Sequence, residues 1–121
     1  DFDLSNGTNR FNCSVCWKAS AWFAIVQQEK LKLLSGEKVM GAYRWIPEGK
    51  TESHLTYKFC SHCGVRIFAA REGERLGGKF FALHVPTLDD ASQDELAAAP
   101  LKFNDVLHNR PDRTPSDTRM L

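Results

Sequence analysis

The sequence lacks a long apolar run and lacks any large excess of charge of one sign. Its longest candidate membrane segment, Ala21 to Val26, is far shorter than the roughly 20 residues that a transmembrane helix needs. Sixteen basic and fifteen acidic side chains leave a formal charge of +1. A protein that binds nucleic acid through its phosphates usually carries a clear basic excess. We therefore expect neither a membrane protein nor a nucleic-acid-binding protein.

The chain also has no charged leader followed by an apolar run, so nothing in it predicts secretion. Its four cysteines form two Cys-x-x-Cys pairs, Cys13 with Cys16 and Cys60 with Cys63. Two disulfides would suit a secreted protein, but this spacing without a leader is typical of a metal site in a reducing compartment. We expect a cytoplasmic protein that binds zinc through all four cysteines.

The apolar pattern predicts a single, mostly β domain over residues 1–121, a length usual for one domain. Period-two alternation is clearest where Leu55, Tyr57 and Phe59 share one face of a strand. The other predicted strands are residues 22–26, 31–33 with 39–46 as their partner, 65–69 and 79–85. Residues 72–78, rich in glycine and charge, are predicted to form a loop.

One short helix is predicted, from Asp89 to Ala99. Ser92 and Glu95 have the spacing of a capping box, and Pro100 ends the helical pattern. Asp89 and Asp90 are interpreted as N-terminal capping residues. The polar tail from Asn104 onward is expected to have little regular structure.

The second cysteine pair lies between two predicted strands, in the order strand, Cys-x-x-Cys-Gly, strand. This is how a zinc knuckle is built, because a tight turn directs both thiolates toward one metal ion. Gly64 is suited to the positive φ that the return of the chain needs. From spacing alone, one interpretation is a single closed four-cysteine zinc site with a purely structural role.

Several motifs, in order along nearly the whole chain, carry a resemblance to a known family. They are residues 3–8, Arg10 to Cys16, residues 34–37 (Leu-Ser-Gly-Glu), Phe59 to Gly64, Val85 to Asp90 and Thr118 to Leu121. With these motifs the chain resembles the glutathione-dependent formaldehyde-activating enzymes, a family that includes centromere protein V. The resemblance implies a β-tent fold, in which small antiparallel sheets are held around zinc.

The resemblance also implies that the four cysteines serve two zinc ions. Cys60 and Cys63 resemble half of a structural site, whose other half in the family is a Cys-x-Cys pair farther upstream. The chain shows no such pair, so we expect that an N-terminal segment is missing ahead of Asp1 or that the site is completed differently.

Cys13 and Cys16 resemble two of the three ligands of the family's reactive zinc, which lie in a Cys-x-Cys-x-x-Cys motif. Phe11 stands at the first position of that motif, and phenylalanine cannot bind zinc. Another residue or a water molecule must then complete the shell, and His54 and His62 are the candidates considered.

The resemblance implies a zinc-dependent carbon–sulfur lyase-like enzyme that acts on glutathione or small-thiol adducts, with Cys13 and Cys16 at the catalytic site. An open zinc position favours the thiolate of glutathione, which adds to formaldehyde and gives S-hydroxymethylglutathione. Basic residues such as Lys18, Arg66 and Arg71 would help to hold this anionic substrate, although most surface cations are simply solvated.

Two alternatives stay open. The first is a non-catalytic zinc module, in which the four cysteines only stabilise the fold and the surface binds a partner. The second is reduction of methionine sulfoxide, since such enzymes also join two Cys-x-x-Cys pairs in a β fold. That reaction needs a reactive cysteine outside the two pairs, and the sequence has none.

Overall fold

The computed structural model describes residues 3–46, 48–49, 51, 55–73, 78–108, 110–119 and 121. The prediction made for His54 lies outside these residues. The chain forms two compact units. The first unit comprises Asp1–Ala24 and Val85–Leu121, and the second comprises Ile25–His84.

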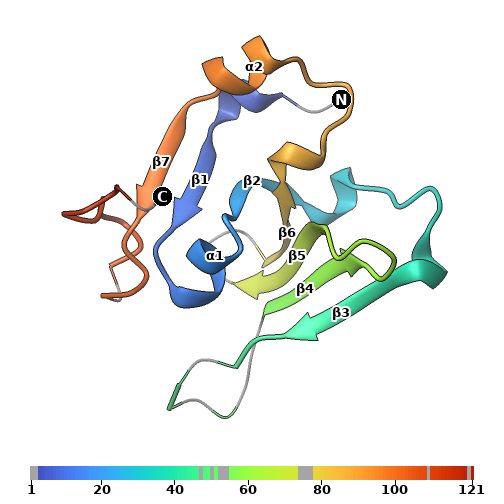
Figure 1. Cartoon of the computed structure of the whole chain (residues 1–121), viewed down its shortest axis with the longest axis horizontal. Helices are drawn as coiled ribbons and strands as arrows, with labels where there is room; N and C mark the ends of the chain where they lie inside the picture. The colour runs from blue at the N-terminus through green and yellow to red at the C-terminus, as the bar shows by residue number, and fades with distance from the viewer. Residues whose placement is uncertain are drawn as a thin grey trace. The chain divides into compact units, whose positions relative to one another are not determined.

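Strand β1 (Thr8–Phe11) is central to the first unit. It pairs antiparallel with the start of β2 (Trp22–Gln27) and parallel with β7 (Leu101–Asn104). Figure 1 shows β1 and β7 side by side, running in the same direction. The parallel pair departs from the antiparallel sheets that we expected. β7 was not predicted, because it is short and its partner strand lies at the other end of the chain.

Thr8 ties these strands together from a fully buried position. Its hydroxyl donates a hydrogen bond to the carbonyl oxygen of Pro100 (2.8 Å) and accepts one from Nε1 of Trp22 (2.8 Å). The turn before it contains Gly7, whose φ of 102° lies in the region that favours glycine. These two hydrogen bonds stabilise the junction, because a buried hydroxyl without a partner would lower the free energy of unfolding.

Two short helices belong to the first unit, α1 (Ser14–Lys18) and α2 (Gln93–Ala98). The capping box predicted for α2 is confirmed, with Ser92 and Glu95 bonded reciprocally. The capping role assigned to Asp89 and Asp90 is wrong, because Ser92 is the N-cap residue and the helix begins after it. Helix α1 was not predicted at all.

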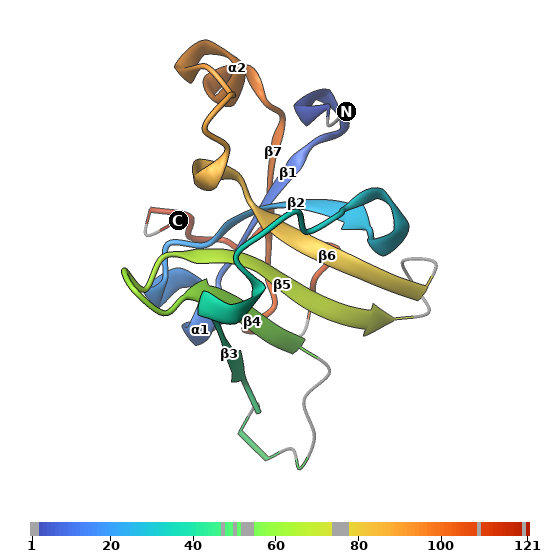
Figure 2. The ribbon, with the colours of Figure 1, turned by 90° about the vertical axis from the view of Figure 1, so that its right-hand side faces the viewer.

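The second unit contains four antiparallel strands in the spatial order β3-β4-β5-β6. They are β3 (Met40–Arg44), β4 (Leu55–Cys60), β5 (Arg66–Gly73) and β6 (Gly78–His84). Figure 2 shows β4, β5 and β6 as a twisted layer. Tyr57, from the apolar face predicted for the strand at residues 55–59, is buried in this unit together with Ala69 and Phe80. The mostly β class is confirmed.

Single turns of 3-10 helix complete the regular structure of the described residues. They span Leu4–Asn6, Gln28–Lys30, Glu37–Val39 and Val85–Thr87. No helix in the described part of the chain is long and apolar enough to cross a membrane.

The strand predicted at residues 31–33 is wrong. These residues have no regular structure, and the neighbouring Leu34 is 85% exposed. The predicted partner strand exists as β3, but it pairs with β4 instead. Alternating leucines alone do not form a strand where no neighbouring strand offers hydrogen bonds. The loop predicted to begin at Glu72 is also too long, since β5 continues to Gly73 and β6 begins at Gly78.

Gly41 allows β3 and β4 to pair closely. It lies opposite Phe59, and a Cβ atom added to it would lie 2.5 Å from Cζ of that ring. We predict that Gly41→Ala lowers the free energy of unfolding by about 1–2 kcal/mol through overpacking. Urea unfolding would measure this loss, with Ala42→Ser at the next, exposed position as the control. An unchanged stability of Gly41→Ala would contradict the close approach.

Candidate functional site

The first cysteine pair brackets the start of α1. Cys13 is the N-cap residue, and its carbonyl oxygen accepts hydrogen bonds from the backbone N–H groups of Cys16 and Trp17 (3.0 Å each). Both cysteines are buried, at 7% and 5% exposure. The short helical turn therefore brings the two thiols together within the interior of the first unit. The cysteines were predicted from their spacing, whereas the helix that orients them was not.

The two thiols of this pair interact directly. A hydrogen bond with the Cys16 thiol lowers the pKa of Cys13 from 9.0 to about 7, and nearby backbone N–H groups also lower it. Burial acts in the opposite direction but is the weaker effect. A substantial fraction of Cys13 is therefore the thiolate near neutral pH, which is the nucleophilic and metal-binding form.

The segment just before Cys13 is held by the C-terminal part of the chain. We call residues 105–108, which follow β7, the tail loop. Nδ2 of Asn12 donates to Oδ1 of Asp105 (2.6 Å), and the backbone N–H of Leu107 donates to Oδ1 of Asn12 (2.8 Å). The hydrogen bond from Asn12, with a smaller effect of His108, lowers the pKa of the Asp105 carboxyl. Sequence reasoning missed this contact because no local pattern links residues so far apart.

The second cysteine pair forms the predicted turn in the second unit. Cys60 ends β4, its carbonyl oxygen accepts from the N–H of Gly64 (2.8 Å), and its own N–H donates to the Val65 carbonyl (2.9 Å). The positive φ predicted for Gly64 is confirmed at 76°. Cys63 is exposed, in contrast to the first pair. Hydrogen bonds from the backbone at Cys63 and His62, and from the Cys63 thiol, lower the pKa of Cys60.

Phe11, where the family motif has a cysteine, is a packing residue. It ends β1 and its ring centroid lies 6.2 Å from that of the buried Phe23. An apolar ring in this position contributes to the core and offers no donor atom to a metal ion. The observed contact gives a physical role to the residue that departs from the motif.

Each cysteine pair suits zinc in donor chemistry, since each places two thiols side by side. Neither pair reaches a complete ligand set within the residues that the structure describes. No group of three or more His, Cys, Asp or Glu side chains suited to a metal ion occurs there. The binding of zinc by Cys13, Cys16, Cys60 and Cys63 stays a prediction.

His62, named above as a candidate to complete the zinc shell, is exposed on the turn between Cys60 and Cys63. The guanidinium of Arg66 lies over the ring of Tyr57, 4.4 Å from its centroid. Lys18 and Arg71 are exposed. Of these cations, only Lys18 belongs to the helix that carries a cysteine.

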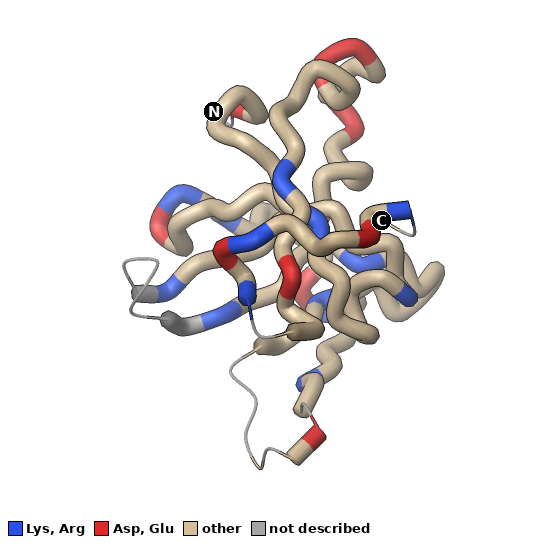
Figure 3. Tube along the Cα trace, turned by 90° about the vertical axis from the view of Figure 1, so that its left-hand side faces the viewer, with Lys and Arg blue, Asp and Glu red and all other residues tan. Residues whose placement is uncertain are grey.

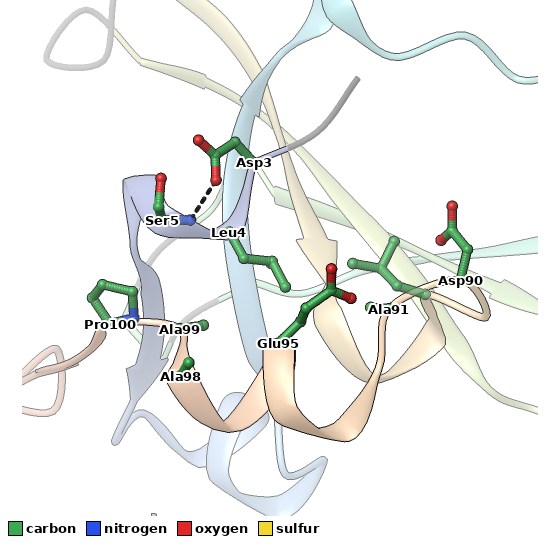
Figure 4. Close-up of a pocket in the computed structure, with 10 residues that line it drawn as sticks. Asp3, Leu4, Ser5, Asp90, Ala91, Glu95, Ala98, Ala99 and Pro100 are labelled. Atoms are coloured by element: carbon green, nitrogen blue, oxygen red, sulfur yellow. Dashed lines mark hydrogen bonds between the residues drawn. The ribbon is translucent and has the colours of Figure 1, made fainter.

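A cavity of about 800 Å³ opens in the first unit beside α2 (Figure 4). Leu4, Leu88 and Pro100 line it together with the carboxylates of Asp3, Asp90 and Glu95, and no cysteine is among its described lining residues. Figure 3 shows acidic residues at α2, and residues 88–100, which include this helix, contain four carboxylates and no lysine or arginine. An acidic lining disfavours an anionic ligand such as glutathione, so we assign no function to this cavity.

The lowered pKa of Cys13 predicts how stability depends on pH. Between about pH 7 and pH 9 the unfolded chain, with its ordinary thiol pKa of 9.0, binds more protons than the folded chain. The free energy of unfolding of the reduced, metal-free protein should therefore rise over this range, and the contribution is lost as the pH falls through about 7. Urea unfolding of Cys13→Ser should show a smaller rise, whereas an identical rise would contradict the assignment.

Comparisons with known proteins place the chain in a family. A crystal structure of a Rhodobacter sphaeroides protein is similar, with a TM-score of 0.61 and 20% sequence identity over 78% of this chain and 80% of that one. This likeness concerns the fold alone. No protein with a curated description matches the sequence. The model of the glutathione-dependent formaldehyde-activating enzymes matches residues 6–103. That match covers most of the chain, which therefore belongs to the glutathione-dependent formaldehyde-activating enzyme family.

Proposed function

We propose that this protein is a carbon–sulfur lyase-like enzyme that makes or breaks an adduct of glutathione, or of another small thiol, with formaldehyde. Family membership supports the class of reaction. The observation that carries the proposal is the buried Cys13–Cys16 pair, in which one thiol has its pKa lowered to about 7. Paired thiols of this kind suit a site that handles thiolates.

The proposed reaction requires no oxidant or reductant. The sulfur of the thiol substrate forms a bond to the carbon of formaldehyde, and the π bond of the carbonyl breaks. The thiol proton ends on the carbonyl oxygen, which gives the hydroxymethyl thioether. The reverse reaction breaks the carbon–sulfur bond and returns the proton to sulfur. The site must therefore stabilise a thiolate and move one proton.

Cys13 and Cys16 would hold a zinc ion in this proposal. When bound, zinc would act as a Lewis acid that favours the thiolate form of the substrate. Phe11 supplies no third ligand, so a water molecule or a residue outside the described set would have to complete the shell. A reducing, cytoplasmic location would suit two thiol pairs that bind metal.

Residues of α1 beyond the cysteines would contact the substrate. Lys18 ends the helix and is exposed, so its ammonium group is available to a carboxylate of glutathione. Trp17 is 38% exposed and would provide an apolar wall next to the cysteine pair. Both residues adjoin the reactive pair in the sequence, which places them on the same short helix.

A second candidate function is supported by Phe11. Position 11, where the resemblance implies a cysteine ligand, is occupied by Phe11, whose ring packs on Phe23. The protein would then be a non-catalytic zinc module, in which the cysteines stabilise the fold and the surface binds a partner. This candidate predicts that a chelator unfolds the protein. It also predicts that the zinc-loaded protein shows no thiol-dependent turnover.

Steady-state formation of S-hydroxymethylglutathione from glutathione and formaldehyde tests the enzymatic proposal. We predict that Cys13→Ser and Cys16→Ser each lower kcat/KM by about 100-fold or more, the loss expected when a metal that provides several kcal/mol is no longer held. Ser14→Ala, an exposed neighbour between the two cysteines, should leave the rate unchanged. Absence of any turnover above the uncatalysed rate in zinc-loaded wild-type protein would reject the enzyme and favour the second candidate.

Phe11→Cys tests whether the family motif can be rebuilt. This substitution should raise the zinc content per chain after dialysis, because it adds a third thiol to Cys13 and Cys16. It should also lower the stability of the metal-free protein by about 1–3 kcal/mol, since the contact with Phe23 is lost. Phe11→Ser is the matched control, which removes the ring without adding a zinc ligand. Equal zinc content in both variants would show that position 11 does not border the metal site.

A further inference from the structure

Hydrogen bonds from the tail loop and from the end of β7 hold Asn12, the residue before Cys13. Both ends of the Asn12 side-chain amide are used, Nδ2 by Asp105 (2.6 Å) and Oδ1 by the backbone N–H of Leu107 (2.8 Å). The backbone N–H of Asn12 donates to the carbonyl oxygen of Asn104 (3.3 Å). Three hydrogen bonds therefore fix the residue that immediately precedes Cys13.

Asp105 is itself held in place. Its side chain is only 13% exposed, and Nδ1 of His108 lies 2.8 Å from Oδ1 and 3.0 Å from Oδ2. The backbone of Asp105 donates to the Arg113 carbonyl (2.9 Å) and accepts from the Arg110 N–H (2.7 Å). By contrast, the ion pair of Asp117 with Arg119 is exposed and stays within the tail. Because these contacts hold the Asp105 carboxylate in place, its hydrogen bond also restricts the position of the Asn12 side chain.

We propose that Asp105 is a positioning residue for the Cys13–Cys16 site, which it orients through Asn12. The inference deepens the proposed function and rests on it for its catalytic meaning. Asn12 is bonded to Cys13 through the peptide, and the carbonyl oxygen of Cys13 starts α1 by accepting from Cys16 and Trp17. Fixing Asn12 thus fixes Cys13 relative to the helix that carries Cys16. A displacement of about 1 Å in such a site can cost about 100-fold in rate.

Hydrogen exchange tests the positioning without any assay of activity. In Asp105→Ala the amides of Cys16 and Trp17 should exchange about tenfold faster, the change expected for the loss of one hydrogen bond to a charged group. Amides of β4 and β5, in the second unit, should exchange at the wild-type rate. Asp117→Ala is the matched control, since it removes a tail carboxylate that does not touch Asn12. Unchanged exchange at Cys16 and Trp17 in Asp105→Ala would overturn the inference.

Exchanging the two partners distinguishes positioning from a general loss of stability. Asn12→Asp places two carboxylates against each other and should accelerate the same amides. The double variant Asn12→Asp/Asp105→Asn restores one donor and one acceptor and should return exchange toward the wild-type rate. If Asp105→Ala does not fold, comparing Asn12→Asp with the double variant still tests whether the hydrogen bond positions the site. A double variant no better than Asn12→Asp alone would mean that the hydrogen bond does not position the site.

Kinetics then connects the contact with catalysis. If the proposed reaction occurs, Asp105→Ala should lower kcat by about tenfold to 100-fold with little change in KM, because the substrate is still bound but the thiol site is misaligned. The partner exchange should restore kcat. Wild-type protein without turnover would reject the proposed function, while the exchange rates would still decide whether Asp105 positions Cys13.

Discussion

The parallel pairing of β1 with β7 is the constraint on which the first unit depends. It joins Thr8–Phe11 to Leu101–Asn104, two segments from opposite ends of the chain. The buried hydroxyl of Thr8 secures this junction by bonding to Pro100 and Trp22. Because β1 leads directly into Asn12 and Cys13, and β7 leads directly into the tail loop, the same pairing that closes the unit also brings Asp105 to the cysteine site.

The two Cys-x-x-Cys pairs have the same spacing but different surroundings. The first caps a short helix, is buried and has a thiol whose pKa is about 7. The second ends a strand at a tight glycine turn, where Cys63 is exposed. Burial of both thiols distinguishes the first pair from the second, in which Cys63 is exposed. The spacing alone could not make this distinction, since it is identical in both pairs.

Phe11 gives a packing role to a position where the resemblance to the family implies a zinc ligand. Its ring packs on Phe23, so the position contributes apolar contact where the family motif has a thiolate. Packing of this kind stabilises the unit whether or not metal is present. The fold therefore tolerates the change, and the chemistry of the site is what the change puts into question. Function belongs to such sites rather than to the fold as a whole.

The sequence by itself determined the family, the mostly β class, the strands with clear alternation, the capping box of α2 and the glycine turn at Gly64. Each of these depends on neighbouring residues, so a local pattern reveals it. Only the tertiary structure decided the burial of Cys13 and Cys16, the parallel partner of β1, the irregular course of residues 31–33 and the contact between Asn12 and Asp105. These depend on which distant segments meet, because hydrogen bonds and burial across a fold leave no local periodicity in the chain.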